Sequence, residues 1–286
     1  MNTQFWLIQA FNGISYGALL FLVGSGLSLI FGVMRIVNLS HGSYFLLGGY
    51  VALSVIWTTG SWALAIPVAA LSIAAVGLLM ERIFLRPLGF DPLRQVLLTV
   101  GFAFLFQQAA LDIWTGNNFD INPPEALTKS VVVGGLYLPL YRIFMIATAA
   151  AIGLVLWLVM EKTRMGAAVR ATVDDAQMAR GVGIDTSRIS MLIFSLGAFL
   201  AALGGVIGGA FLGIYPGLDF EMLPIAFAVV IIGGMGSLGG AAIGALLVGL
   251  ADNFGKALFP EVSYFTLYAP MALILAVKPT GLFGRE

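Results

Sequence analysis

The sequence has no cysteine and a single histidine, His41. Without thiols the chain cannot form a disulfide, a thiolate metal site or a cysteine nucleophile, and one histidine excludes a multi-histidine metal site. Charged residues are also scarce, at 10% of the chain, and they balance to a formal net charge of zero. A neutral chain lacks the positive surface that nucleic acid requires, so the sequence predicts no nucleic-acid partner.

Apolar residues, in contrast, make up 60% of the chain and give a mean hydropathy of +1.00. These values exceed those of a soluble globular domain and indicate a polytopic protein of a lipid membrane. At about 20 residues per span, eight to ten spans would use most of the 286 residues. We therefore expect a single transmembrane domain, residues 1–286, with any large soluble site on another polypeptide. The N-terminus has no basic n-region, so we expect its first apolar run to remain as a span.

The apolar runs predict an all-α bundle of about eight or nine membrane elements. They cover residues 6–32, 44–57 (beginning at the capping residues Asn38 or Ser40), 62–85, 95–114, 139–160, 189–214, 222–232, 241–258 and 264–277. Arg82, Arg86 and Arg94 cluster in one turn, which the positive-inside rule places in the cytosol. Alternating crossings then put the C-terminus inside, the N-terminus outside, and the interval 115–138 in an outside loop.

One of these runs, residues 222–232, is too short to cross a membrane alone. It is followed by the glycine-rich segment GGMGSLGG, residues 233–240. A glycine-rich break between apolar halves is typical of a discontinuous helix beside a protein-lined cavity, because exposed backbone cannot face lipid. We therefore expect a broken or re-entrant helix near residues 222–240, and the sequence leaves open whether it crosses or re-enters.

The longest polar interval is residues 161–190, which holds five of the fourteen lysines and arginines. Good helix formers without proline predict a short helix from Arg164 to Arg180. Gly181 and Gly183 would end it, because glycine adopts the left-handed C-cap conformation without strain. A short amphipathic helix between two spans suits docking into the groove of a cytosolic protein. The alternative is an ordinary connection that happens to be charged.

Three stretches resemble one family of membrane proteins. The run RATVDDAQMARGVGIDTSRI, residues 170–189, is similar to the cytoplasmic coupling loop of ABC importer permeases, most of all the branched-chain amino acid group. FGVMRIVNLSHGSYFLLGGY and VVIIGGMGSLGGAAIGALL agree with the same group, in the family's order. The resemblance implies a second homologous permease subunit, two cytosolic ABC ATPase subunits, an extracytoplasmic substrate-binding protein and a bacterial-type inner membrane. It also implies no cofactor in this chain, since the ATPases bind the ATP.

Residues of the polar interval would then couple transport to ATP hydrolysis by docking into the ATPase as a rigid lever. The coupling residues expected are Gly166, Arg170, Asp174, Asp175, Ala176, Gln177, Ala179, Gly181 and Gly183.

Two polar or glycine-rich breaks are candidates for the translocation path. They are Asn38, Ser40, His41 and Gly42 near the start, and Gly233, Gly234, Gly236 and Ser237 near the end. For the first group the alternative is helix capping, which accounts for Asn and Ser. For the second it is tight helix packing, which glycine serves equally well.

Enzyme motifs fail on inspection, so we expect no enzyme. Residues 249–257 depart from a P-loop in glycine spacing and at Ala257, and Ser237 lacks the glycine two residues before it that a nucleophile elbow needs. An ion-coupled secondary carrier or channel acting alone is the main alternative. Ion-coupled carriers commonly bury carboxylates at mid-membrane to bind the driving ion. The sequence shows none there, because Asp112 and Glu81 lie near span ends, and this weakens the alternative. The substrate, whether a branched-chain or other small hydrophobic amino acid, urea, an amide or an aromatic acid, stays open, as does a homo- or heteromeric permease pair.

Overall fold

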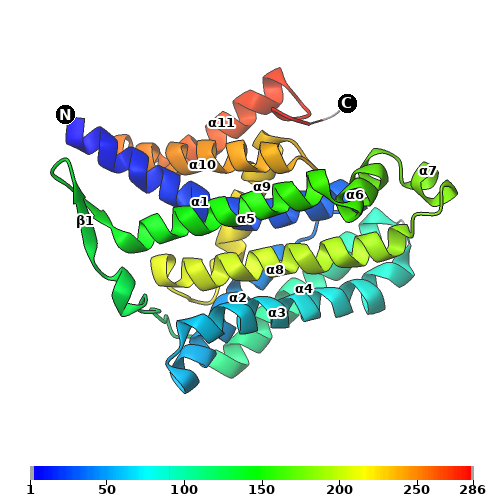
Figure 1. Cartoon of the computed structure of the whole chain (residues 1–286), viewed down its shortest axis with the longest axis horizontal. Coiled ribbons are helices and arrows are strands. Elements are labelled where there is room, and N and C mark those ends of the chain that lie inside the picture. The colour runs from blue at the N-terminus through cyan, green and yellow to red at the C-terminus, as the bar shows by residue number, and fades with distance from the viewer. Residues whose placement is uncertain (1–2, 90, 285–286) are drawn as a thin grey trace.

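The computed structural model describes residues 3–89 and 91–284, and it is a helical bundle with one small hairpin (Figure 1). The helices are α1 (Thr3–Met34), α2 (His41–Thr59), α3 (Trp62–Met80), α4 (Pro92–Trp114), α5 (Leu140–Lys162), α6 (Arg164–Asp174), α7 (Ala176–Gly181), α8 (Thr186–Leu212), α9 (Leu218–Gly233), α10 (Leu238–Leu258) and α11 (Ser263–Val277). A π-helical turn (Glu81–Leu85) and short 3-10 turns (Arg86–Leu88, Glu125–Leu127, Pro260–Val262) connect some of them. Strands β1 (Ser130–Val133) and β2 (Leu136–Pro139) pair antiparallel.

Each predicted apolar run forms a helix, but the expected count of eight or nine spans is not confirmed. Among the described residues, six helical segments are long and apolar enough to cross a membrane. They are Thr3–Met34, Trp62–Leu88, Pro92–Trp114, Leu140–Lys162, Thr186–Leu212 and Leu238–Leu258. The other apolar helices fall short for physical reasons: α9 and α11 have only 16 and 15 residues, and α2 carries several polar side chains.

The long helices share one direction, so the bundle has two distinct ends (Figure 1). At the hairpin end lie β1, β2 and the start of α1, where Gln4 approaches the turn at Gly135. At the loop end lie α6 and α7, and the Arg35 guanidinium donates to the Val173 carbonyl at 3.5 Å. The predicted outside loop and the predicted cytosolic loop therefore lie at opposite ends.

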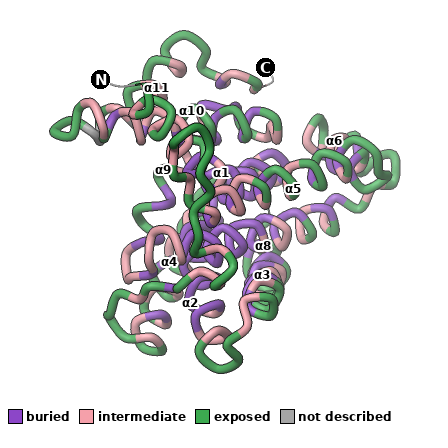
Figure 2. Tube along the Cα trace, turned by 60° about the vertical axis from the view of Figure 1, so that its left-hand side comes forward, coloured by how far each residue is buried: buried purple, intermediate pink, exposed green. Residues whose placement is uncertain are grey.

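Helices α1 and α8 form the centre of the bundle and are the most buried of the six membrane-length segments (Figure 2). Small residues bring the backbones together, as at Gly26, where an added Cβ would lie 2.7 Å from the Gly197 carbonyl oxygen. Close approach of this kind stabilises helix pairs through van der Waals packing. In lipid there is no hydrophobic gain when two apolar helix surfaces meet, because the lipid tails are equally apolar. Helices α3, α4 and α5 instead expose large apolar side chains such as Leu71, Leu97 and Val155, which suits contact with lipid.

Helix α9 runs across the bundle rather than along it (Figure 1). Its first turn packs on α2, where the Asp219 backbone lies against Gly42, and its middle packs on α1, where Val229 lies against Gly24. Its last residue, Gly233, contacts the start of α10. The helix begins at Leu218, four residues before the predicted run, because Gly217 adopts a left-handed φ of 98° and turns the chain into it.

The predicted break near residues 222–240 is a tight turn between α9 and α10. Gly234 and Gly236 have φ values of 101° and 81°, which residues with a side chain rarely adopt. Ser237 then caps α10, because its Oγ accepts from the Gly240 N–H at 3.0 Å. Residues 282 and 283 close this turn by donating their N–H groups to the carbonyls of Ile232 and Gly233.

Candidate functional site: the coupling loop and a buried polar cluster

The polar loop folds as two helices, so the prediction of one helix from Arg164 to Arg180 is wrong at its middle. Asp175 is extended, with φ −152° and ψ 103°, and its Oδ1 accepts from the N–H groups of Gln177 and Met178 at 2.8 and 2.9 Å. An aspartate that caps the following turn competes with continuation of the preceding helix. The capped helix α7 therefore leaves α6 at an angle (Figure 1).

The expected coupling residues divide between the two sides of this loop. Gly166 and Ala179 are buried against the chain itself, and Arg170 and Ala176 are half-buried. The remaining five, Asp174, Asp175, Gln177, Gly181 and Gly183, are exposed. Two exposed apolar side chains of this loop, Met178 at 66% and Val182 at 72% exposed, were not among the expected coupling residues. Their apolar character in a polar interval was the available signal, because exposed apolar side chains on a docking helix supply contact area.

Helix α6 is fixed firmly to the bundle. Val169 is buried and belongs to a cluster with Leu156 and Met160 of α5 and Ile189 and Ile193 of α8. The end of α5 and α6 are also joined by an ion pair of 3.9 Å between Glu161 and Arg170. A force on the loop therefore reaches two membrane helices through packed side chains rather than through a flexible linker.

The first group of path candidates lies deep inside the bundle. Asn38, Ser40, His41 and Gly42 are all buried. His41 Nε2 lies 2.9 Å from the carbonyl oxygen of Val23, so this nitrogen carries the proton that is donated. Residues 23–34 of α1 span about 16 Å at 1.5 Å per residue. His41 therefore contacts α1 well inside the bundle, far from the loop-end terminus of that helix.

Capping explains only part of this group. The Asn38 side-chain oxygen accepts from both the N–H and the Oγ of Ser40, at 3.1 and 2.7 Å. Ser40 precedes α2, yet among the described residues its side chain makes no capping hydrogen bond to that helix. The Oγ is turned toward Asn38, Tyr44 and the Met80 sulfur instead.

The structure adds Asp219, which sequence reasoning missed. Asp219 is 2% exposed, and its Oδ2 accepts from the Ser43 hydroxyl at 3.2 Å. The predicted apolar run begins only at residue 222, after Asp219, whereas α9 begins at Leu218 and carries Asp219 against α2. The acidic first turn of a helix that follows Pro-Gly was the available signal. The expectation that the interior lacks a buried carboxylate is therefore also wrong, because Asp219 is one.

Three buried polar atoms of this cluster have no hydrogen-bond partner in the described part of the chain: Asn38 Nδ2, His41 Nδ1 and Asp219 Oδ1. Buried polar groups are otherwise nearly always paired, since an unmade hydrogen bond there costs about 1–3 kcal/mol. The three atoms offer a donor, a neutral acceptor and a carboxylate oxygen. These three atoms are polar groups in the interior of the bundle that a polar solute could still hydrogen-bond.

The second group of path candidates lies nearer the loop end, at close backbone contacts. An added Cβ on Gly32 of α1 would lie 2.8 Å from the Gly236 Cα, and Gly233 lies against the Gly240 backbone. Gly234 lies against residue 284 of the C-terminal segment, and the Ser28 hydroxyl donates to the Ser237 carbonyl at 3.3 Å. These contacts account for the glycines by packing, and a role in the path stays a prediction.

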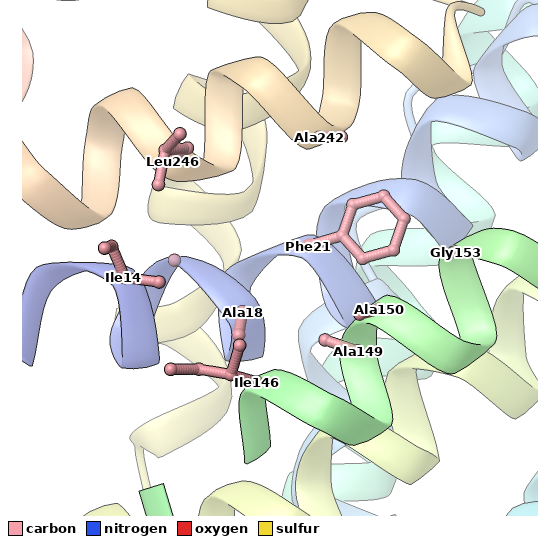
Figure 3. A pocket seen from close by; sticks show the side chains of 10 residues that line it. Ile14, Ala18, Phe21, Ile146, Ala149, Ala150, Gly153, Ala242 and Leu246 are labelled. Carbon is pink, nitrogen blue, oxygen red and sulfur yellow. The ribbon is translucent and has the colours of Figure 1, made fainter. Parts of the chain in front are cut away.

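An apolar groove of about 270 Å³ runs among α1, α5 and α10 (Figure 3). Ile14, Ala18 and Phe21 face Ile146 and Ala149 across it, and Leu246 closes one side. None of the ten described residues that line it has a polar side chain. The groove therefore has no group that could bind the charged ends of an amino acid, and it is not the polar site.

Comparison with known proteins identifies the family of the chain. Residues 9–275 match a family model described as the permease component of branched-chain amino acid transport systems. The chain belongs to this permease family. Over its whole length the permease is 32% identical to the high-affinity branched-chain amino acid transport system permease protein LivH of Escherichia coli (strain K12), and it covers 98% of LivH. It is 29% identical to BraD of Pseudomonas aeruginosa, over 98% of this chain and 96% of BraD.

A more distant match is LivM of Escherichia coli (strain K12), a permease protein of the same system as LivH. The permease is 26% identical to LivM over 91% of its own length and 67% of LivM. No solved structure matches the chain significantly. Family membership and the six apolar helical segments together make the chain a multi-pass membrane protein, and the family match confirms the resemblance to branched-chain amino acid permeases.

Proposed function

We propose that this permease forms the translocation path of an ATP-driven importer for branched-chain or other small hydrophobic amino acids in a bacterial-type inner membrane. A second homologous permease completes the path, an extracytoplasmic binding protein delivers the substrate, and two cytosolic ATPases supply the energy. The family match over residues 9–275 carries this proposal. Similarity to both LivH and LivM supports a pair of related but different permeases.

The loop of α6 and α7 is the coupling element in this proposal. Its outer surface presents Asp174, Gln177, Met178 and Val182, while its inner surface is packed on α5 and α8. When the ATPases close on ATP, a docked α7 moves as a rigid body and the two membrane helices follow. The turn containing Arg86 and the loop containing Arg180 line one pocket, which supports a cytosolic loop end by the positive-inside rule.

The buried cluster of Asn38, His41 and Asp219 is the proposed substrate contact inside the membrane. Asp219 accepts the ammonium group and the Asn38 amide donates to the carboxylate as the helices separate. A carboxylate at this position favours an amino acid over urea, a neutral amide or an aromatic acid without an amine. Helix α9 carries Asp219 and crosses between α2 and α10, so its movement would open or close the cluster.

The test is uptake of radiolabelled leucine by proteoliposomes that contain the permease with its partner subunits, with and without internal ATP. We expect ATP-dependent uptake that the double change Asp174→Arg, Asp175→Arg abolishes while the protein remains monodisperse and helical. The pair Asp174→Asn, Asp175→Asn is the matched control, because asparagine also caps a helix. Uptake by the isolated chain that ignores both ATP and the charge reversal would contradict the proposal and favour a secondary carrier.

A further inference from the structure

A second pocket opens at the loop end, between the bundle and the coupling loop, with a volume of about 300 Å³. This volume is at the lower limit of small-molecule sites, roughly 300–1,000 Å³. Four parts of the chain form its walls: Met34 at the end of α1, Glu81 and Arg86 in the turn after α3, Gln95 in α4, and Thr172, Arg180 and Ser190 in the loop and the start of α8. We call it the loop pocket.

Glu81 is the buried acid of the loop pocket. The residue is 2% exposed, and its Oε2 has no hydrogen-bond partner among the described residues. A carboxylate oxygen in such surroundings is costly unless a donor or a cation meets it. The structure therefore provides an acceptor that is ready for a ligand with a positively charged or N–H group.

The backbone at Glu81 supports the same conclusion independently. Residues 81–85 form a π-helical turn, a rare conformation that is frequent at functional sites. The turn directs Glu81 and Leu85 inward, while the three residues between them are exposed. Glu81 and Leu85, four residues apart, lie on the inward face of this turn, and Arg86 lines the same pocket.

The remaining lining completes a site for a zwitterion. Arg86 and Arg180 are exposed and line the same pocket as the buried Glu81. Val33, Met34 and Leu85 add apolar surface. The buried carboxylate, the exposed guanidinium groups and the aliphatic side chains of this one pocket offer partners for the ammonium group, the carboxylate and the side chain of an aliphatic α-amino acid.

We propose that the loop pocket binds an α-amino acid with an aliphatic side chain, its ammonium group on Glu81 and its carboxylate toward Arg86 and Arg180. The identity of the ligand rests on the proposed function, which makes such an amino acid the product released at this end. Because the walls come from both the bundle and the coupling loop, a bound amino acid holds the loop against the bundle. Accumulated product therefore slows its own import.

The first test measures binding to the purified permease in lipid nanodiscs by calorimetry, with L-leucine and with 4-methylpentanoate, which lacks the ammonium group. We expect wild type to prefer leucine at least tenfold, and Glu81→Gln to lose that preference. Glu125→Gln, the same change on an exposed residue at the hairpin end, is the matched control and should bind as wild type does. Equal leucine affinity in wild type and Glu81→Gln would overturn the proposal.

Binding at the membrane cluster must be separated from binding at the loop pocket. Leucine binding that survives Asp219→Asn and is lost in Glu81→Gln supports the loop pocket, and the opposite pattern overturns it. Ser190→Leu fills the pocket without touching the acid, so it tests the site even if Glu81→Gln does not fold. We expect this variant to weaken leucine binding at least tenfold.

The second test measures ATP-driven uptake by the complete transporter in proteoliposomes, as the ratio of rates with and without internal leucine. We expect a ratio well below one for wild type and Glu125→Gln, and a ratio near one for Glu81→Gln and Ser190→Leu. A wild-type ratio of one would overturn the regulatory role. Glu81-dependent binding without any ATP-driven uptake would instead contradict the proposed function and leave the binding site standing.

Discussion

The hydroxyl of Ser43 on α2 donates to Oδ2 of Asp219 on α9 at 3.2 Å, across 176 residues of sequence. Both side chains are buried, and the second carboxylate oxygen of Asp219 has no partner in the described part of the chain. The contact therefore fixes the start of the crossing helix and still leaves one acceptor free inside the bundle. It joins the polar residues of α2 to the helix that would have to move for a substrate to pass.

Asp219→Asn should lower leucine uptake at least tenfold. The change keeps the shape of the side chain and an oxygen for Ser43, but it removes the charge that would bind the ammonium group, and a hydrogen bond to a charged group contributes about 1.5–3 kcal/mol. The measurement is ATP-driven uptake at matched protein levels. Asp112→Asn, on the exposed surface of α4, is the control and should transport normally. Equal uptake by both variants would remove Asp219 from the path.

Gly32→Ala should destabilise the permease by about 1–3 kcal/mol, because the new Cβ would lie 2.8 Å from the Gly236 Cα and force α1 away from the turn before α10. Thermal unfolding in detergent measures the effect as a fall in Tm. Gly101→Ala is the matched control, since no atom lies within 4 Å of its added Cβ. That control should be neutral or slightly stabilising, because alanine is the better helix former. A fall in Tm of the same size for both would show that packing at Gly32 is not the cause.

Asp175→Ala should uncouple ATP hydrolysis from uptake more than Asp175→Asn does. Alanine removes both hydrogen bonds that start α7, at a cost of about 0.5–2 kcal/mol to that helix, whereas asparagine keeps the acceptor. The informative quantity is the number of leucines imported per ATP hydrolysed by the reconstituted complex. If the alanine and asparagine variants both lose coupling, and to the same extent, the charge of Asp175 matters and the cap does not.

The absence of cysteine allows a clean test of orientation, since any introduced cysteine is the only one in the chain. Tyr137→Cys, 74% exposed in the hairpin, should react with a membrane-impermeant maleimide added to intact cells. Gln177→Cys, exposed on α7, should react only in inverted vesicles. The reverse labelling pattern would show that the loop end faces outside, where no ATPase could reach it.

Much of the fold follows from the sequence because membrane helices are specified by composition over about 20 residues. The apolar runs predict the helices, and the polar interval, residues 161–190, predicts the exposed loop. The direction of a helix within the bundle does not follow from its composition. Residues 222–232 alone do not show whether the helix crosses the bundle or runs along it, because this depends on the close contacts that α9 makes at Gly42 and Gly24.

Site residues were predictable only where the local pattern was sufficient. Asn38 and His41 stood out as polar residues between apolar runs, and the structure places both in the buried cluster. Asp219 did not, because its burial depends on Gly217 starting α9 early and on contact with a residue far away in sequence. Asp175 was named for its charge, whereas the structure shows that it also divides the loop into two helices.

The short C-terminal segment completes the hydrogen bonding at the end of α9. Residues 282 and 283 donate to the carbonyls of Ile232 and Gly233, which α9 itself cannot satisfy at its end. Proline at positions 282 and 283 would remove both donors and leave the two carbonyls at the end of α9 without these partners. A segment that adds no span therefore completes the hydrogen bonding of the helix that runs across the bundle.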